Sequence, residues 1–487
     1  MYRLCSVLPP PEAPCRTAPR LWNPLFSATV FAIGLLFSLH AYSQAPSTPV
    51  PSTFFGMTSI VPSSEYPTVS IGNFGKESAA EWGYIEPNAP TGGGCPGTAN
   101  CAHTYNWSTL DSYVSTAAAH GIPFMWTWDY APSWATGGAG CGSSARCTGN
   151  ITDLADMDAF VQALVTRYDG NHGHGTIQAY ETGNEVWSSG GFTGTMSQLV
   201  TIINRMVRDI RAANPNAKVG GPVGEGAPDY YYVSGGKIDQ FFAAGGTKDF
   251  NFITFHGYPH HSDDSPEYLV GSCVPSGSSD GHGEVACIKA MMARNGIPSS
   301  TPIWMTEGGW ADSSYSNCVN RTGGGSSTTG CENTTNNVLK QAFVSRYMLE
   351  MWSAGVSRAN WYDWGNRGWG TLCVPGSCGA TTAASAWQQV YNWMVGSTMT
   401  TPCAIESGSI WTCGLTLSGG TQALAVWNTS GSSGYPVPSA YTQYSDLSGN
   451  TNSAGSSVTI DITPILLRGG VVATAPKPPT SLRIVVQ

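Results

Sequence analysis

Short apolar runs rich in β-branched and aromatic residues alternate with longer amphipathic stretches along most of the chain. The short runs predict strands, whereas apolar positions that recur every three or four residues predict helices. The predicted strands cover 54–59, 68–72, 122–128, 177–183, 218–223, 250–257, 302–308 and 357–364. The predicted helices cover 108–121, 156–170, 195–215, 237–245, 283–296 and 336–355, and several of them end at Gly or Asn-Pro, as helices often do.

Eight strands that alternate with helices over residues 54–396 predict an α/β fold, a (β/α)8 TIM barrel. A doubly wound sheet is the main alternative, but the Gly-rich phosphate turn that should follow its first strand is absent. The helical pattern stops near residue 397. Strand, turn and strand then follow one another through 409–431 and 441–469, which is typical of a small all-β sandwich.

The ends of the chain predict export and a tail. An apolar run, Leu25 to Leu39, follows Arg20 and precedes a small-x-small pattern at Ala41 and Ser43, which predicts a secretory signal peptide. A membrane anchor is the alternative, but the run is shorter than the roughly 20 residues that span a bilayer. We therefore expect a signal peptide at 1–43, a linker at 44–53, the barrel at 54–396, the β-sandwich at 397–472 and a Pro-rich tail at 473–487.

Composition agrees with a secreted protein that lies in the extracellular space or the periplasm. Only 11% of the residues are charged, against about 25% in average soluble proteins. The net charge is -9 and no Lys/Arg cluster occurs, which argues against nucleic acid or an anionic membrane as a partner. The sequence does not indicate an oligomeric state.

Twelve of the 14 cysteines follow the expected cleavage point and fall as close neighbours. An even number in an exported chain predicts six local disulfides, although spacing alone leaves the connectivity open. Zinc is a poorer interpretation because no tight CxxC pair occurs. The neighbours are Cys95 and Cys101, Cys141 and Cys147, Cys273 and Cys287, Cys318 and Cys331, Cys373 and Cys378, and Cys403 and Cys413.

Two glutamates stand where a barrel places reactive groups, at the carboxyl ends of strands. Glu185, in "TGNEVW", follows the fourth predicted strand, and Glu307, in "WMTEGGW", ends the seventh. They are 122 residues apart, or three βα units of about 40 residues, so we expect them to face each other. Two facing carboxylates without metal ligands suit glycoside hydrolysis, in which retention needs a separation of about 5–5.5 Å.

These two motifs resemble the strand-four Asn-Glu motif and the strand-seven nucleophile motif of clan A glycoside hydrolases. The resemblance implies that Glu185 is the general acid/base, that Glu307 is the nucleophile and that Asn184 binds the sugar 2-hydroxyl. "FHGYP" matches the strand-six pattern, in which Tyr258 would contact the nucleophile with His256 beside it.

The runs "EWGYIEP" and "YNWSTLDSYVS" are similar to the family 39 type. The chain departs from that pattern in two places: a cysteine-bearing insertion, 88–104, splits the two motifs, and strand two lacks the Arg of several clan relatives. The resemblance implies a secreted retaining enzyme that cleaves β-linked oligo- or polysaccharides without a cofactor. A non-catalytic carbohydrate-binding or cell-surface protein on the same scaffold is the alternative.

Aromatic residues at strand ends suit the C–H faces of sugars, so we expect Trp128 to bind substrate. The resemblance to clan A places a sugar platform on the eighth strand, which implies the same role for Trp361 and Trp364. Core packing is the alternative for each of them, and His256 could likewise be a core histidine. Glu86 is expected to be structural, and Glu181 is expected either to be structural or to support the catalytic residues from behind, without being the catalytic acid. The His-containing stretches 171–175 and 259–264 lack a third ligand at regular spacing, so no metal site is predicted.

Overall fold

The structure is a computed structural model that describes residues 48–58, 66–75, 80–141, 146–188, 191–222, 231–259, 264–274, 283–310, 337–365, 372–373 and 381–471. The expected signal peptide, the Pro-rich tail, Cys318, Cys331 and Cys378 lie outside these residues. No helix in the described part of the chain is long and apolar enough to cross a membrane.

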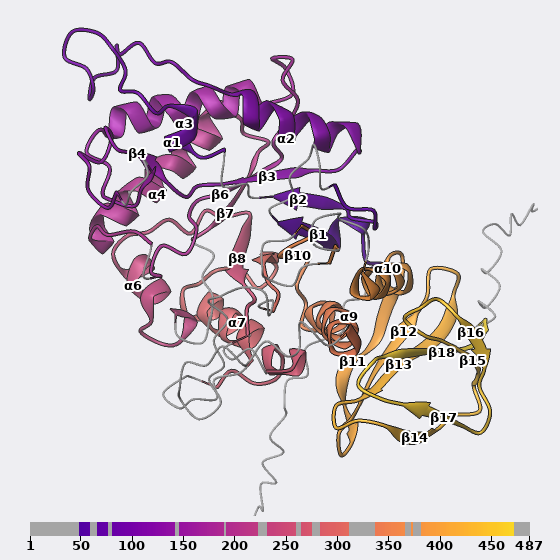
Figure 1. The fold of residues 1–487 in the computed structure, drawn as a ribbon. Coiled ribbons are helices and arrows are strands. Elements are labelled where there is room, and N and C mark those ends of the chain that lie inside the picture. Colours follow the sequence, from indigo (N-terminus) through magenta and orange to yellow (C-terminus); the bar gives the residue numbers. More distant parts are fainter. Residues whose placement is uncertain are drawn as a thin grey trace, which may run out of the picture. The chain divides into compact units, whose positions relative to one another are not determined.

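Eight parallel strands close into a barrel in the order β1-β10-β9-β8-β7-β6-β3-β2, which confirms the predicted TIM barrel (Figure 1). The strands are β1 (Phe55–Thr58), β2 (Asn73–Gly75), β3 (Phe124–Thr127), β6 (Ala179–Glu181), β7 (Lys218–Gly221), β8 (Phe252–His256), β9 (Ile303–Glu307) and β10 (Arg358–Trp361). A short pair, β4 (Ala131–Pro132) and β5 (Arg146–Cys147), lies outside the barrel sheet.

Six helices match the six predicted ones: α2 (Ser108–Ala119), α3 (Leu154–Arg167), α4 (Met196–Ala213), α6 (Lys237–Ala243), α7 (Glu284–Arg294) and α9 (Asn337–Ser353). Helix α4 begins with a capping box, in which Thr195 and Gln198 each accept a backbone N–H of the other. Helix α10 (Thr382–Met394), the four-residue α1 (Trp82–Ile85), and the 3-10 turns η1 (Ser52–Phe54) and η2 (Pro266–Leu269) are not among the predicted elements.

The second strand was predicted at 68–72, and that position is wrong: β2 begins only at Asn73. The preceding segment is held on α10 instead, where Trp387 Nε1 donates to the Ser70 carbonyl at 3.0 Å and Ser70 N donates to Gln388 Oε1 at 2.7 Å. Gly72 then passes so close to η1 that a Cβ would lie 2.0 Å from the Ser52 carbonyl oxygen. Tertiary contacts therefore override the local β-propensity.

The described end of the expected linker is packed onto the barrel. Val50 is buried and bridges to Val395, with Val50 N donating to the Ser397 carbonyl at 2.9 Å. An apolar side chain next to the end of α10 gains more from burial than from exposure, so this segment does not behave as a free connector.

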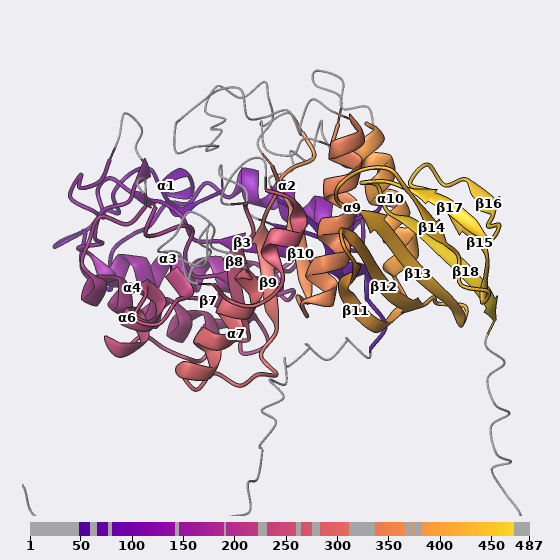
Figure 2. The ribbon, with the colours of Figure 1, turned by 90° about the horizontal axis from the view of Figure 1, so that it is seen from below.

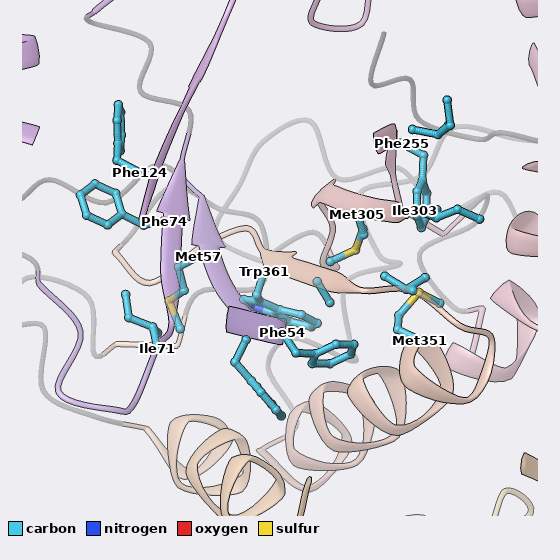
Figure 3. Close-up of a cluster of buried hydrophobic side chains, with 14 of the residues drawn as sticks. Phe54, Met57, Ile71, Phe74, Phe124, Phe255, Ile303, Met305, Met351 and Trp361 are labelled. Atoms are coloured by element: carbon cyan, nitrogen blue, oxygen red, sulfur yellow. The ribbon is translucent and has the colours of Figure 1, made fainter. Parts of the chain in front are cut away.

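A hydrophobic core fills the space between the strands and the outer helices. Figure 3 shows part of it, including Phe54, Met57 and Trp361, with Met351 on the neighbouring helix α9. Each of these four side chains is almost completely buried. This packing fixes the strands that present the candidate site.

The C-terminal region forms two antiparallel sheets, which confirms the predicted sandwich. The larger sheet orders β11 (Thr398–Ser407), β12 (Ile410–Thr416), β13 (Thr421–Asn428), β18 (Ile465–Val471), β15 (Tyr441–Ser445) and β16 (Thr451–Ser453). The smaller sheet pairs β14 (Ser433–Pro436) with β17 (Ser457–Ile460), and its core includes Val426, Tyr435 and Leu467. Figures 1 and 2 both show the larger sheet beside α9 and α10.

A buried ion pair joins barrel and sandwich. Arg346 of α9 binds both carboxylate oxygens of Glu267 in η2, and Trp427 Nε1 of β13 donates to the same carboxylate at 2.7 Å. Arg346 and Glu267 are nearly inaccessible to solvent, so each charge depends on the other for its compensation.

Four of the expected disulfides are present: Cys95–Cys101, Cys141–Cys147, Cys273–Cys287 and Cys403–Cys413. Cys373 is also in a disulfide. Each of the four links residues that are no more than 14 positions apart, so they close short loops.

Candidate active site

A β-bulge between β8 and β9 sets the register at the carboxyl end of the barrel. Phe255 pairs with Met305, but His256 pairs with Glu307, so Thr306 is the additional residue. A bulge of this kind inserts one residue into one strand and re-aims the side chains that follow it. The bulge therefore brings Glu307 opposite His256.

Glu185, His256 and Glu307 converge at this end of the barrel. His256 Nδ1 lies 2.6 Å from Glu185 Oε1 and 3.6 Å from Glu307 Oε2. One side-chain atom of each residue lies within 4.8 Å of the other two, so the two glutamates approach to that distance. An upper limit of 4.8 Å between one oxygen of each glutamate favours the spacing of about 5–5.5 Å in retaining glycosidases over the 6.5–9.5 Å of inverting ones.

The three side chains differ in their access to solvent. The Glu185 side chain is 33% exposed, that of Glu307 is 5% exposed and that of His256 is completely buried. A molecule that approaches from solvent therefore reaches Glu185 first, whereas Glu307 forms the floor of the site.

Tyr258 fixes the buried glutamate. Its hydroxyl donates to Glu307 Oε2 at 2.8 Å, the contact that the strand-six motif implied. Burial, together with the negative charge of Glu307, raises the pKa of Tyr258 well above its usual value. The phenol therefore stays protonated and remains a donor to the carboxylate.

Glycines on both strands allow a helix to approach the site from behind. A Cβ at Gly257 or Gly308 would lie 2.2 or 2.4 Å from the Tyr347 hydroxyl oxygen of α9. That hydroxyl donates to the Gly257 carbonyl at 2.7 Å. The Gly after His256 and the Gly after Glu307 are thus required by close packing, which places the two strand ends firmly.

Glu185 lies on a tight turn after β6 and has a backbone φ of 40°. It is the only non-glycine residue with positive φ in the described chain. Such a conformation costs of order 1–3 kcal/mol and is typical of functional sites. Gly191 closes the turn, because a Cβ there would lie 2.3 Å from the Glu185 carbonyl oxygen.

Glu181 lies beneath the three converging residues, inside the barrel. It is fully buried and accepts hydrogen bonds from Thr127 Oγ1 at 2.8 Å and Thr306 Oγ1 at 2.9 Å. Burial raises its pKa, and the nearby His256 acts in the opposite direction. Glu181 thus shares the electrostatic environment of the site without facing solvent.

Asn184 and Trp128 lie beside these residues. Both line a cavity that also contacts Asp129, Thr182 and Phe192, between the β3 and β6 loops and α4. The Trp128 ring packs against Trp82 with 5.7 Å between centroids and is 7% exposed. Its position reaches the cavity, although most of the indole belongs to the core.

The predicted sugar platforms on the eighth strand lie in the core. Trp361 and Trp364 are 3% and 0% exposed, and Trp361 packs on Trp310 and on Tyr347 of α9. Tyr362 is instead half-buried, with its ring 6.4 Å from that of Tyr258. The period-2 alternation of β10 could have signalled Tyr362, since neighbours on a strand face opposite sides.

The other sequence candidates are held in local networks. Glu86 accepts from Trp82 Nε1 at 2.9 Å and lies 2.7 Å from His103 Nδ1, which agrees with a structural role. His172 pairs with Asp169, and residues 260–263 of the second His-containing stretch lie outside the described residues.

The converging trio is also the place where a metal ion could bind, since two carboxylates and one imidazole each offer a ligand atom. Any such ion would have to break the 2.6 Å contact between His256 Nδ1 and Glu185. The short contact shows that the two side chains already satisfy each other.

Comparison with solved structures supports the fold. A family 39 glycoside hydrolase from Bacteroides cellulosilyticus WH2 is 16% identical, with a TM-score of 0.61 over 86% of this chain and 81% of that one. A monomeric β-xylosidase from Caulobacter crescentus CB15 is 13% identical (TM-score 0.56, 87% and 97% covered). A glucosidase from Croceicoccus marinus is also 13% identical (TM-score 0.55, 87% and 97% covered).

No family model matches the chain, and no curated protein sequence matches it. Identities this low indicate a shared fold and leave the chemistry to be argued from the site.

Proposed function

We propose that this protein is a retaining glycoside hydrolase that cleaves β-linked oligo- or polysaccharides. The observation that supports this most strongly is the approach of Glu185 and Glu307 to within 4.8 Å at the carboxyl end of a TIM barrel. The structural neighbours named as a β-xylosidase and a glucosidase agree with a carbohydrate substrate.

Glu307 is the proposed nucleophile. One of its carboxylate oxygens bonds to the anomeric carbon while the glycosidic C–O bond breaks, and the leaving oxygen takes the proton of Glu185. Water then transfers a proton to Glu185 and its oxygen to the anomeric carbon, which releases Glu307. The Tyr258 hydroxyl holds the unreacted oxygen of Glu307 in place throughout.

Glu185, as acid/base, must alternate between protonated and ionised forms, and His256 can accommodate both. His256 Nδ1–H can donate to Glu185 Oε1 across 2.6 Å in both forms, so the proton of the acid form lies on the other carboxyl oxygen, from which it can pass to the leaving group. The greater exposure of Glu185 gives water a route to it in the second step. This accessibility is an argument for Glu185, rather than Glu307, as the acid/base.

The disulfides support a protein that functions outside the cytosol. Four local disulfides in one chain are typical of oxidising compartments. We propose secretion to the extracellular space or periplasm, with cleavage of the N-terminal segment.

The test combines turnover with trapping. Purified protein is assayed on a panel of polysaccharides and aryl glycosides, beginning with xylosides and glucosides, and then exposed to matching 2-fluoro glycosides for intact-mass analysis. We expect turnover, and one added glycosyl mass that is lost in Glu307→Gln. Glycan binding without turnover on any compound would favour the non-catalytic alternative, and labelling that persists in Glu307→Gln would reject the assigned nucleophile.

A further inference from the structure

A second polar crevice lies at the amino end of the barrel. Lys218 and Arg358 are the first residues of β7 and β10, and Trp304 is the second residue of β9. All three line this crevice. Glu307 ends β9, so the crevice lies at the opposite end of the same strands from the candidate active site.

Aromatic stacking forms the floor of the crevice. The rings of Phe252 and Trp304 are 3.7 Å apart and nearly parallel, at 19°. The Arg358 guanidinium lies 3.9 Å from the centre of the Trp304 ring, and Lys218 Nζ lies 5.9 Å from it. The two positive charges are therefore within about 10 Å of each other, around one indole.

Arg358 differs from most arginines of the described chain in having no carboxylate partner. Arg167, Arg205, Arg208, Arg211, Arg294 and Arg346 each form an ion pair. Neither Arg358 nor Lys218 forms an ion pair or side-chain hydrogen bond with the described residues. Arg468, in the sandwich, also forms no ion pair with the described residues.

Burying the Arg358 guanidinium without a carboxylate partner costs desolvation free energy. Arg358 is partly buried, and this burial lowers its pKa to about 10, so it still carries its charge at neutral pH. Stacking on an aromatic ring compensates the desolvation of the guanidinium only in part, because the ring accepts none of its N–H donors. Five N–H donors in a planar fork remain to be satisfied, and that geometry matches a bidentate oxyanion.

The remaining lining is compatible with an anion. Gln178 and Asn214 contribute side-chain amides. Asp169 contributes a carboxylate, but its Oδ1 already accepts from Asn171 N at 2.7 Å and lies 3.0 Å from His172 Nδ1, and its Oδ2 accepts from Asn171 Nδ2 at 3.3 Å. With two cations against one engaged carboxylate, the crevice has a net positive charge in a protein of net charge -9.

We propose that the crevice around Arg358, Lys218 and Trp304 binds an oxyanion, which is either the carboxylate of an acidic sugar or a free inorganic sulfate or phosphate. Arg358 provides the bidentate contact, and Lys218, whose long side chain begins at the exposed start of β7, closes on the ligand from the other side. The proposal does not depend on glycosidase activity.

Isothermal titration calorimetry at constant ionic strength in chloride tests the proposal, because screening then stays the same in every titration. The whole protein is titrated with sodium sulfate, with sodium phosphate, with glucuronate and with glucose. We expect saturable binding of at least one anion and none of glucose. Binding of glucuronate alone would identify a sugar carboxylate as the ligand, whereas binding of sulfate or phosphate would identify the free oxyanion.

Variants then locate the binding. Arg358→Gln should weaken it at least tenfold, Lys218→Met should weaken it to a smaller extent, and Arg468→Gln should leave it unchanged as the matched control. Circular dichroism and the melting temperature establish that each variant is folded. If Arg358→Gln does not fold, the weaker binding expected of Lys218→Met still tests the proposal. Absence of saturable anion binding, or equal weakening by Arg468→Gln, would overturn the proposal and leave the stack a purely structural feature.

Discussion

The two ends of the barrel contain the same kind of secondary structure and opposite chemistry. At the carboxyl end, Glu181, Glu185 and Glu307 each contact a donor from a neighbouring strand or loop. At the amino end, Arg358 and Lys218 stack on or near Trp304 and have no acceptor in the described chain.

The difference shows where the protein has organised its polar groups in advance. The acidic end is internally satisfied, so its geometry exists before any ligand binds, as catalysis by positioned groups requires. At the basic end, the N–H donors of Arg358 and Lys218 have no acceptor among the described residues, so only a ligand or water can satisfy them. Substitutions at the two ends should therefore separate effects on rate from effects on binding and stability.

Glu307→Gln should have the largest effect. Removing the nucleophile while its bond to Tyr258 can still form should lower kcat/KM by more than about 10⁴-fold, because the covalent step has no substitute. Steady-state kinetics on an aryl glycoside measures this. A loss of less than about tenfold would mean that another group attacks the sugar.

Glu185→Ala should lower turnover of natural glycosides by about 10²–10⁴-fold, the usual contribution of a general acid. Aryl glycosides with good leaving groups need less protonation, so their first step should be spared and azide should restore turnover. Parallel kinetics on both substrate types, with and without azide, checks this. Equal losses on both without rescue by azide would contradict the acid/base role.

Glu181→Gln should have an intermediate effect of about tenfold on kcat, with a shifted pH–rate profile, because it changes the charge near His256 without touching substrate. Steady-state rates from pH 4 to 9 measure both changes. Glu406→Gln, an exposed acid of the sandwich, is the control.

Glu181 also predicts a pH dependence of stability. Burial raises its folded-state pKa, so the folded protein binds the proton more tightly than the unfolded chain. The stabilisation that comes from this tighter proton binding is complete below the pKa of Glu181 in the unfolded chain, about 4.3. It is lost as pH rises through the pKa of Glu181 in the folded protein. Urea unfolding at several pH values should show that the free energy of unfolding falls less steeply with rising pH in Glu181→Gln than in the wild type. An unchanged slope would contradict the assignment.

Arg358→Met should have the smallest effect on catalysis. Because Arg358 lies at the other end of the barrel, kcat/KM should stay within about twofold of wild type. The free energy of unfolding should change by less than about 2 kcal/mol, since the lost cation–π contact is opposed by relief of charge burial. Kinetics and urea unfolding on the same preparation test both. A tenfold loss of rate would show that the two ends are coupled.

Much of the fold could be predicted from sequence, because the period of apolar residues depends on local geometry. Seven of the eight barrel strands overlap the predicted runs, and β2 was displaced because hydrogen bonds from α10 hold Ser70. The close spacing of cysteines likewise indicated the disulfides that the structure contains. Such features need few distant contacts.

The site was predictable in part. The positions of Glu185 and Glu307 at strand ends followed from strand counting, and the Tyr258 contact followed from the family motif. The choice of Trp361 over Tyr362 was not supported by burial, because which face of β10 packs on α9 depends on the assembled barrel. The crevice around Arg358 was not predicted, since a basic residue at a strand start is ordinary in sequence.

By itself, the sequence determined the barrel, the sandwich and the positions of the two carboxylates. The hydrophobic period and the position of a residue at a strand end are local properties that can be recognised in the sequence alone. Only the tertiary structure decided the bulge at Thr306, the 2.6 Å contact of His256 with Glu185, and the unpaired state of Arg358. Each of these depends on residues that are far apart in the chain, and their register and burial exist only once the strands have closed.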